Sequence, residues 1–173
     1  MRQGLASTVA ILALFAAPLA FAGTAPRFRA ETLSGEKLDL ETLRKRGPVL
    51  LDFWATWCKP CLASLPEIEA LHRRFGPRGL TVVGVSVDGP RNFAKVRPFV
   101  TRSRLTYPIV LDQDGALQSG FEVRAMPTTV LIDTSGAVVK TVLGYRPGEG
   151  EALAKAIEAL LPSDSAGARR DSL

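Results

Sequence analysis

The sequence contains few of the residues that would mark several common functional classes. Only two cysteines and one histidine occur among its 173 residues. Two cysteines exclude a disulfide-dense scaffold, and one histidine excludes a zinc site built from several imidazoles. The net charge of +5 is small and spread over many segments, so the chain lacks the basic patch of a nucleic-acid-binding protein. With 46% apolar and 23% charged residues, it is neither wholly disordered nor a multi-span membrane protein, and its length predicts one domain.

A long apolar run occurs near the N-terminus. It spans Leu5 to Ala17, follows Arg2, and is followed by Pro18 and the small-x-small pattern of residues 20–22. This layout predicts a secretory signal peptide over residues 1–22, with an uncleaved membrane anchor as the alternative. We expect the folded domain to cover residues 25–161 and residues 162–173 to form a disordered tail.

The body of the chain alternates strand and helix patterns, which predicts an α/β fold with a mixed central sheet flanked by helices. An N-terminal β-hairpin around Ser34-Gly35 precedes the sheet, and a helical segment is inserted between two central strands. The expected strands are 28–33, 36–40, 48–54, 80–87, 107–111, 128–133 and 137–143, and the expected helices are 59–75, 91–102 and 149–161. Pro66 and Pro98 fall inside expected helices and predict a kink in the first and a bend or break in the second.

The chemistry is concentrated in Trp57–Cys61, which reads WCKPC and contains both cysteines. An expected strand ends just before this segment and an expected helix begins within it, so Cys58 lies at a helix N-terminus. There the free backbone N–H groups and the positive end of the helix dipole favour a thiolate, and thiols in such motifs have pKa values lowered to about 3.5–7.5. The spacing of three places Cys61 on the same helix face and deeper. We therefore predict that Cys58 attacks a disulfide and Cys61 resolves the mixed disulfide.

Two structural interpretations of the cysteine pair are weaker. A crosslink that closes a ring of four residues removes little freedom from the unfolded chain, on the order of 2 kcal/mol, so it is a poor staple. Half of a zinc site would need further ligands, and the chain has no other cysteine and no histidine nearby.

The segment LLDFWATWCKPC, followed by Met126-Pro127-Thr128 and a β-hairpin, resembles the thioredoxin superfamily. The N-terminal hairpin and the insertion from Asp88 to Tyr107 resemble the exported TlpA/ResA-type branch, whose layout overlaps with that of the peroxiredoxins. The resemblance covers roughly residues 25–161. It implies a thioredoxin-like fold and a periplasmic location, with the membrane-anchored form as the alternative.

The resemblance also implies roles for residues around the motif. Pro127 matches the family's cis-proline, which abuts the cysteine pair, and the backbone of Met126 is expected to pair with an extended substrate segment. Met126 could instead be core filler. Trp57 is expected to be partly exposed beside Cys58 and to contribute to the substrate-binding surface.

Asp52 matches the buried aspartate of thioredoxin proper, a candidate proton acceptor for Cys61. A carboxylate in an apolar strand costs free energy unless it is used or hydrogen-bonded, and the alternative is a solvated residue at a strand end. Ser64 departs from the pattern, because TlpA/ResA-type proteins usually place a glutamate three residues after the second cysteine. They also often have asparagine where this chain has Asp52.

The leading interpretation is an exported thiol-disulfide oxidoreductase that reduces protein disulfides through the Cys58–Cys61 pair. The pair is itself the redox centre, so we expect no cofactor and no metal. The resemblance implies protein thiols and disulfides as partners, a membrane electron donor of the thiol-reducing type, and cytochrome c biogenesis as one process served. We expect a monomer that binds no nucleic acid.

Three alternatives stay open. A peroxiredoxin-like peroxidase needs a Pro-x-x-x-Thr/Ser-x-x-Cys arrangement, whereas Pro48 lies ten residues before Cys58. A copper metallochaperone of the thioredoxin fold could use both thiolates and Met126, but His72 is about 16 Å beyond Cys61 along the helix and is expected at the surface. The third alternative is a binding module with an inert disulfide.

Overall fold

The computed structural model describes residues 23–162, so the predicted signal peptide and the tail beyond Pro162 lie outside the described residues. Within this range, no helix has the length and apolar character needed to cross a membrane. The elements follow in the order β1 Arg29–Glu31, β2 Lys37–Asp39, α1 Leu40–Arg44, β3 Val49–Trp54, α2 Lys59–Phe75, a 3-10 turn Gly76–Arg78, β4 Thr81–Ser86, α3 Phe93–Arg102, β5 Ile109–Leu111, α4 Ala116–Gly120, β6 Thr128–Ile132, β7 Val138–Leu143 and α5 Glu149–Leu160.

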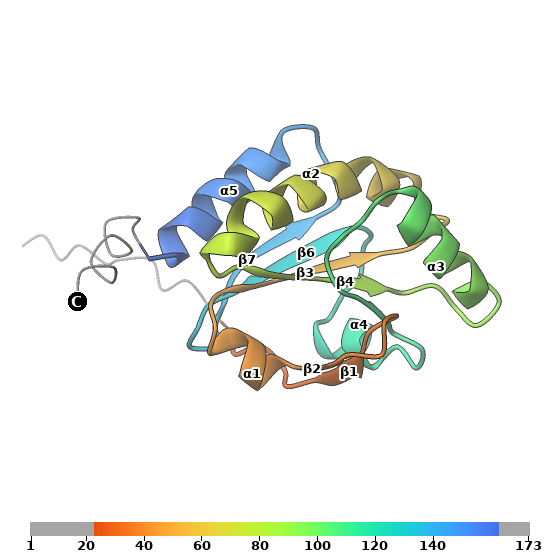
Figure 1. The fold of residues 1–173 in the computed structure, drawn as a ribbon, viewed down its shortest axis with the longest axis horizontal. Helices are drawn as coiled ribbons and strands as arrows, with labels where there is room; N and C mark the ends of the chain where they lie inside the picture. The colour runs from red at the N-terminus through yellow and green to blue at the C-terminus, as the bar shows by residue number, and fades with distance from the viewer. Residues whose placement is uncertain (1–22, 163–173) are drawn as a thin grey trace, which may run out of the picture.

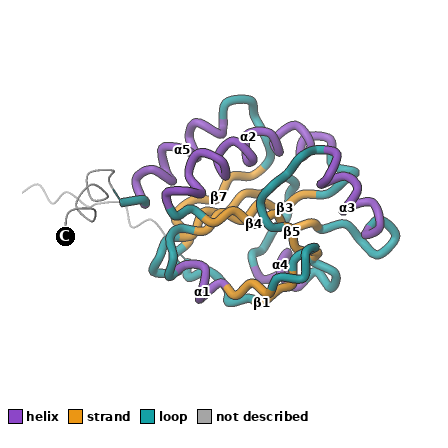
Figure 2. The backbone as a smooth tube through the Cα atoms, in the orientation of Figure 1, coloured by secondary structure: helices purple, strands orange, loops and turns teal. Residues whose placement is uncertain are grey.

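A five-stranded sheet in the order β5-β4-β3-β6-β7 forms the centre of the molecule (Figure 1). Strand β3 pairs in parallel with β4, which pairs in parallel with β5, while β6 and β7 complete the sheet in antiparallel orientation. Figure 2 shows this sheet lying between layers that contain helices. The predicted α/β class and mixed sheet are confirmed, and the topology is thioredoxin-like.

Strand β3 is buried at every position, and its side chains alternate between two apolar clusters. Leu50 and Trp54 face the cluster formed with α2, α3 and α5. Leu51 and Phe53 face the cluster formed with β2, α1 and α4. The two layers lie on opposite faces of the sheet in Figure 1. Asp52 therefore points, by alternation, toward the α2 face.

The N-terminal hairpin is confirmed, and it forms a two-stranded sheet of its own rather than joining the central one. It lies against the edge strand β5 through an isolated bridge between Thr32 and Val110 and through the Leu33 N–H, which donates to the carbonyl of Ile109 over 2.8 Å.

Two short helices were not predicted from the sequence. Helix α1 begins at Leu40, where the prediction had a strand, because Asp39 caps it by accepting the Thr42 N–H over 3.0 Å. Helix α4 follows β5 after a short loop, and the Asp112 carboxylate accepts the Leu117 and Gln118 N–H groups over 2.9 and 2.8 Å. With five residues each, these helices are too short for a helical period to show.

Both prolines lie inside continuous helices. Helix α3 begins at Phe93 rather than Arg91 and is a single helix that includes Pro98, so of the predicted bend or break the break is wrong. Helix α2 is one helix that includes Pro66, where the sequence predicts a kink.

Two carboxylates fasten α2 to its neighbours. Glu69, which is buried, accepts the N–H and the hydroxyl of Thr106 over 2.9 and 2.7 Å, which ties α2 to the segment before β5. Glu67 accepts the Tyr145 hydroxyl over 2.9 Å and the Gly150 N–H over 2.8 Å, which ties α2 to the start of α5. The helix that carries the cysteines is therefore held from both sides.

Gly84 in β4 gives a test of this packing. A Cβ atom there would lie 2.5 Å from Ile109 Cδ1 and 2.9 Å from Tyr107 Cε2. We expect Gly84→Ala to lower the free energy of unfolding by about 1–3 kcal/mol, the usual cost of overpacking, as measured by urea denaturation. Gly89→Ala is the control, because a Cβ there meets no heavy atom within 4 Å. Equal midpoints for the two variants would contradict the packing described.

Candidate active site

The two cysteines form a disulfide at the start of α2, with an S–S distance of 2.04 Å. Cys58 is the N-cap of α2, and its sulfur accepts the Cys61 N–H over 3.3 Å. Pro60 occupies the first helical turn, where no donor is needed. Cys58 is 5% exposed and Cys61 is fully buried, so Cys58 is the more accessible sulfur, as the sequence predicts.

The loop before Cys58 is held by an aspartate that sequence reasoning missed. Asp88, at the end of β4, accepts the Thr56 N–H over 2.9 Å and the Thr56 hydroxyl over 2.6 Å. The Ser86 hydroxyl donates to the same carboxylate over 3.0 Å. Asp88 is fully buried, so its charge is balanced by these hydrogen bonds. The sequence signal that could have identified Asp88 is an acidic residue directly after a predicted buried strand, residues 80–87.

The Met126-Pro127 peptide bond is cis, as the resemblance implies. Phe53, near the end of β3, pairs with Thr128, the first residue of β6. Pro127 directly precedes β6 and therefore lies at the same end of the sheet as the loop that leads to Cys58. Met126 is half-buried and packs against the apolar cluster that contains both cysteines. Pro127 is buried, and its carbonyl accepts the Gly144 N–H over 2.7 Å.

Trp57 and Trp54 differ in exposure in the way the sequence indicates. Trp57 is 59% exposed and directly precedes Cys58, whereas Trp54 is fully buried and stacks at 5.3 Å between ring centroids on Phe99 of α3. Trp57 and Cys58 follow the end of β3, and Met126 precedes the start of β6, so all three lie at the same end of the sheet.

Asp52 lies inside the sheet and is fully buried, which rules out the solvated alternative. It is in register with Thr129 of β6 and Gly84 of β4, and the Thr129 hydroxyl donates to Asp52 Oδ1 over 3.2 Å. Among the described residues, Asp52 Oδ2 has no hydrogen-bond partner. Burial raises the pKa of Asp52 to about 7, against the opposing hydrogen bond from Thr129. A carboxyl group with this pKa can gain or lose a proton near neutral pH.

Further polar groups are buried near Gly84, on the side of Asp52 away from Thr129. The Tyr107 ring and Trp54 Nε1 fill the space where a Cβ of Gly84 would lie, at 2.9 and 3.2 Å from that position. In the part of the chain that the structure describes, neither the Tyr107 hydroxyl nor Trp54 Nε1 has a partner. Burial, followed by the nearby Asp52 charge, raises the pKa of Tyr107, so this phenol stays protonated.

Ser64 takes the position where the family pattern has glutamate. It is buried, and its hydroxyl donates to the carbonyl of Cys61 over 2.8 Å, so its polar group is used within its own helix. Asp52 is therefore a buried carboxyl group beneath α2, whereas position 64 supplies no acid.

His72 is half-buried rather than fully at the surface, because its ring packs edge-on against Tyr107 with 5.8 Å between centroids. The neighbouring Arg73 is 65% exposed at its side chain and pairs with Glu69 at 2.7 Å. Among residues 23–162, no group of three or more potential metal ligands comes together.

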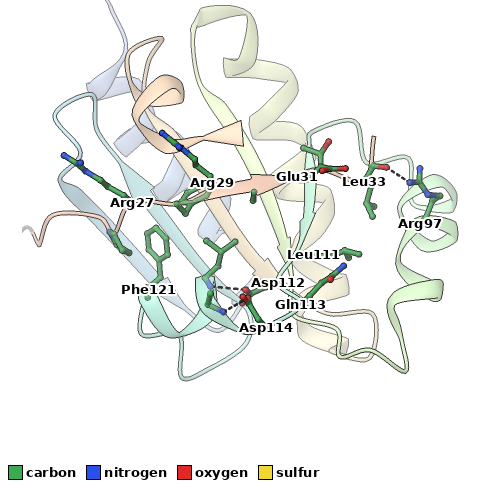
Figure 3. Close-up of a pocket in the computed structure, with 17 residues that line it drawn as sticks. Arg27, Arg29, Glu31, Leu33, Arg97, Leu111, Asp112, Gln113, Asp114 and Phe121 are labelled. Atoms are coloured by element: carbon green, nitrogen blue, oxygen red, sulfur yellow. Dashed lines mark hydrogen bonds between the residues drawn. The ribbon is translucent and has the colours of Figure 1, made fainter. Parts of the chain in front are cut away.

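A groove of about 840 Å³ lies between the hairpin and the β5–α4 segment (Figure 3). Arg27, Arg29 and Arg97 border it, and Arg97 donates to the carbonyl of Leu33. The Asp112 carboxylate in its wall caps α4, so this residue has a structural role. None of the predicted site residues lines this groove.

A disulfide at a helix N-cap and a cis-proline at the same end of the sheet, in this fold, define a thioredoxin-like thiol-disulfide oxidoreductase. The chain belongs to the AhpC/TSA family, which matches residues 22–141.

Relatives and solved structures agree with this assignment. The thiol-disulfide oxidoreductase ResA of Geobacillus thermodenitrificans is 36% identical over 126 residues, which are 73% of this chain and 71% of the relative. The thioredoxin-like protein YneN of Bacillus subtilis is 39% identical over 115 residues, 66% of each chain. The crystal structure of StoA from Bacillus subtilis superposes with a TM-score of 0.65 at 28% identity, and covers 76% of this chain and 96% of StoA.

The buried carboxyl group predicts a pH-dependent stability. The folded-state pKa of Asp52, about 7, lies above the ordinary value of 3.8, so between these values the folded protein holds a proton that the unfolded chain releases. Stability therefore falls as pH rises through this window. We expect Asp52→Asn to unfold at higher urea than the wild type, with an advantage that grows by about 4 kcal/mol between pH 4 and 7.

Urea denaturation at a series of pH values measures this effect. Glu31→Gln, at an exposed site on β1, controls for the loss of one negative charge. If the difference between Asp52→Asn and the wild type is flat across the window, Asp52 does not carry a raised pKa.

Proposed function

We propose that this oxidoreductase acts outside the cytoplasm and reduces disulfide bonds of proteins. The asymmetry of the cysteine pair carries the proposal. Cys58 is the N-cap of α2 and keeps 5% of its surface exposed, whereas Cys61 is fully buried on the face of the sheet that holds Asp52. The N-cap position supports an acidic thiol at Cys58, because free N–H groups and the helix dipole stabilise a thiolate there.

In the reduced enzyme, the Cys58 thiolate attacks one sulfur of the substrate disulfide, the substrate S–S bond breaks, and one substrate thiolate leaves. The Asp52 carboxylate then accepts the proton of the Cys61 thiol. The Cys61 thiolate attacks the Cys58 sulfur, forms the Cys58–Cys61 disulfide and releases the second substrate thiolate. Two electrons pass to the substrate, and its two thiolates take protons from solvent, to which Asp52 returns its own. A membrane donor of dithiol type restores the reduced pair.

Trp57, Met126 and Pro127 form the surface on which the substrate lies in this proposal. Pro127 offers no N–H, and the backbone of the half-buried Met126 is suited to pair with an extended chain, as in strand addition. Pairing of this kind favours a polypeptide over a small peroxide.

The apolar run of residues 5–17, its flanking arginine and the small-x-small pattern support export to the periplasm. Reduction outside the cytoplasm needs a continuous supply of electrons, which supports the membrane donor. The likeness to ResA supports a role of this kind. We extend the proposal to cytochrome c biogenesis as one process that the reductant serves.

The thiols should titrate separately. We expect the Cys58 thiol of the reduced enzyme to titrate well below 8.5, because it caps α2, and the buried Cys61 thiol to titrate above that value. The rate of iodoacetamide alkylation against pH, with each site quantified by mass spectrometry, measures both pKa values. Two equal titrations near 8.5 would refute the division of roles.

The substrate class can be tested directly. The wild type should reduce insulin and show little turnover with hydrogen peroxide. Cys61→Ser should trap substrate proteins on Cys58 as stable mixed disulfides, because the resolving thiol is missing. Cys58→Ser is the matched control and should trap none. Strong peroxidase activity without insulin reduction would favour the peroxidase alternative.

A further inference from the structure

A second groove runs along α2 on the side that faces α3. It has a volume of about 440 Å³ and is lined by Leu62, Leu65, Pro66, Glu69, Arg73, Phe99, Ser103, Arg104 and Leu105. Four of the α2 residues follow one another at three or four positions and form one stripe along the helix: Leu62, Leu65, Glu69 and Arg73. Pro66 lies directly beside this stripe. From Leu62 to Arg73 this stripe is about 16 Å long.

The stripe begins one helical turn from the nucleophile. Leu62 follows Cys58 by four residues, and its N–H donates to the Cys58 carbonyl over 3.1 Å. Leu62 therefore lies on the helix face that Cys58 occupies. A polypeptide whose sulfur reaches Cys58 must lie across the surface around it, and the lining of this groove begins at Leu62, four residues beyond Cys58 on α2.

The lining of the groove contains both apolar and charged side chains. Leu62, Leu65, Phe99 and Leu105 give it an apolar lining. Two arginines also line it. Arg73 is 65% exposed at its side chain and pairs with Glu69 at 2.7 Å, so the positive charge that this ion pair leaves over is that of Arg104. The Glu69 carboxylate is occupied by Arg73 and Thr106. Within the described range, no ion pair neutralises the exposed Arg104.

We infer that the α2–α3 groove binds the substrate segment that flanks the reacting cysteine, with a bulky apolar side chain close to that cysteine and an acidic side chain further along. An extended chain advances about 3.3 Å per residue, so an acidic residue about six positions from the cysteine reaches the end near Arg73. The inference rests on the proposed reduction of protein disulfides and names the sequence preference of the same site.

Model peptides test this preference. Each carries a central cysteine in a mixed disulfide with thionitrobenzoate, a leucine two residues away and a glutamate six residues away on both sides. A second peptide has glutamine in place of glutamate, and uncharged dithiodipyridine serves as the small disulfide. The rate constant for the reduced full-length enzyme is followed by thiol release in a stopped-flow instrument.

We expect Arg104→Glu to slow reduction of the acidic peptide about tenfold relative to the glutamine peptide, and to leave the rate with dithiodipyridine unchanged. Arg46→Glu, an exposed site in the α1–β3 loop, makes the same change in net charge and should not discriminate between the peptides. Leu105→Ser should slow both peptides and spare dithiodipyridine, whereas Val139→Ser, at a 42% exposed site on β7, should slow none.

Equal effects of Arg104→Glu and Arg46→Glu would overturn the inference, and so would an equal loss of all three rates in Leu105→Ser. A wild type that reduces insulin but does not distinguish the two peptides refutes the groove and leaves the proposed function standing. A wild type that reduces dithiodipyridine but neither insulin nor the peptides refutes the proposed function itself.

Discussion

The complete burial of β3 is the constraint on which the rest of the structure depends. A strand that is apolar on both faces must be covered on both, and this explains why helices α2 and α5 lie over one face while the hairpin, α1 and α4 lie over the other. The same strand delivers the chain to Cys58 at the edge of the sheet. It also holds Asp52 at a position where water has no access. The central sheet, the start of the loop to Cys58 and the buried carboxyl group of Asp52 therefore all depend on one buried strand.

The cysteine pair and the proton acceptor are supported by different layers. Cys58 and Cys61 belong to α2, which Glu67 and Glu69 fasten to the elements on either side. Asp52 belongs to the sheet, where Thr129 holds one of its oxygens. A glutamate at position 64 would instead belong to the same helix as the cysteines. With serine at that position, the acid and the thiols are positioned independently, and their relative placement depends on how α2 packs on the sheet.

Much of this architecture could be predicted from the sequence. The continuous apolar runs identified β3 and β4, the apolar spacing after Lys59 identified α2, and the WCKPC motif identified the redox pair. The burial of Asp52 followed from its place within an apolar run. These predictions succeeded because each depends on a local pattern that is repeated over several residues.

The features that were missed depend on single side chains that meet across the fold. Asp88 reaches Thr56 from another strand, and Asp39 and Asp112 each start a helix too short to have a period. The groove between α2 and α3 is lined by residues of both helices, which the sequence does not place together. At Pro98 the sequence predicted a bend or a break, whereas α3 is one helix whose Val96 is fully buried.

The close approach of Tyr107 to Gly84 has a consequence for how this protein can evolve. The phenol ring occupies the space that any side chain at position 84 would need. A larger residue at 84 needs a smaller side chain at 107 and a shift of Ile109, whose Cδ1 lies at 2.5 Å from the same position, and the loss of the ring at 107 would leave a cavity that a larger residue at 84 can fill. The two positions, 23 residues apart in the sequence, are thus expected to change together among homologues. Position 84 is in register with Asp52. Paired substitutions at 84 and 107 would therefore change the surroundings of the Asp52 carboxyl group while Asp52 itself is kept.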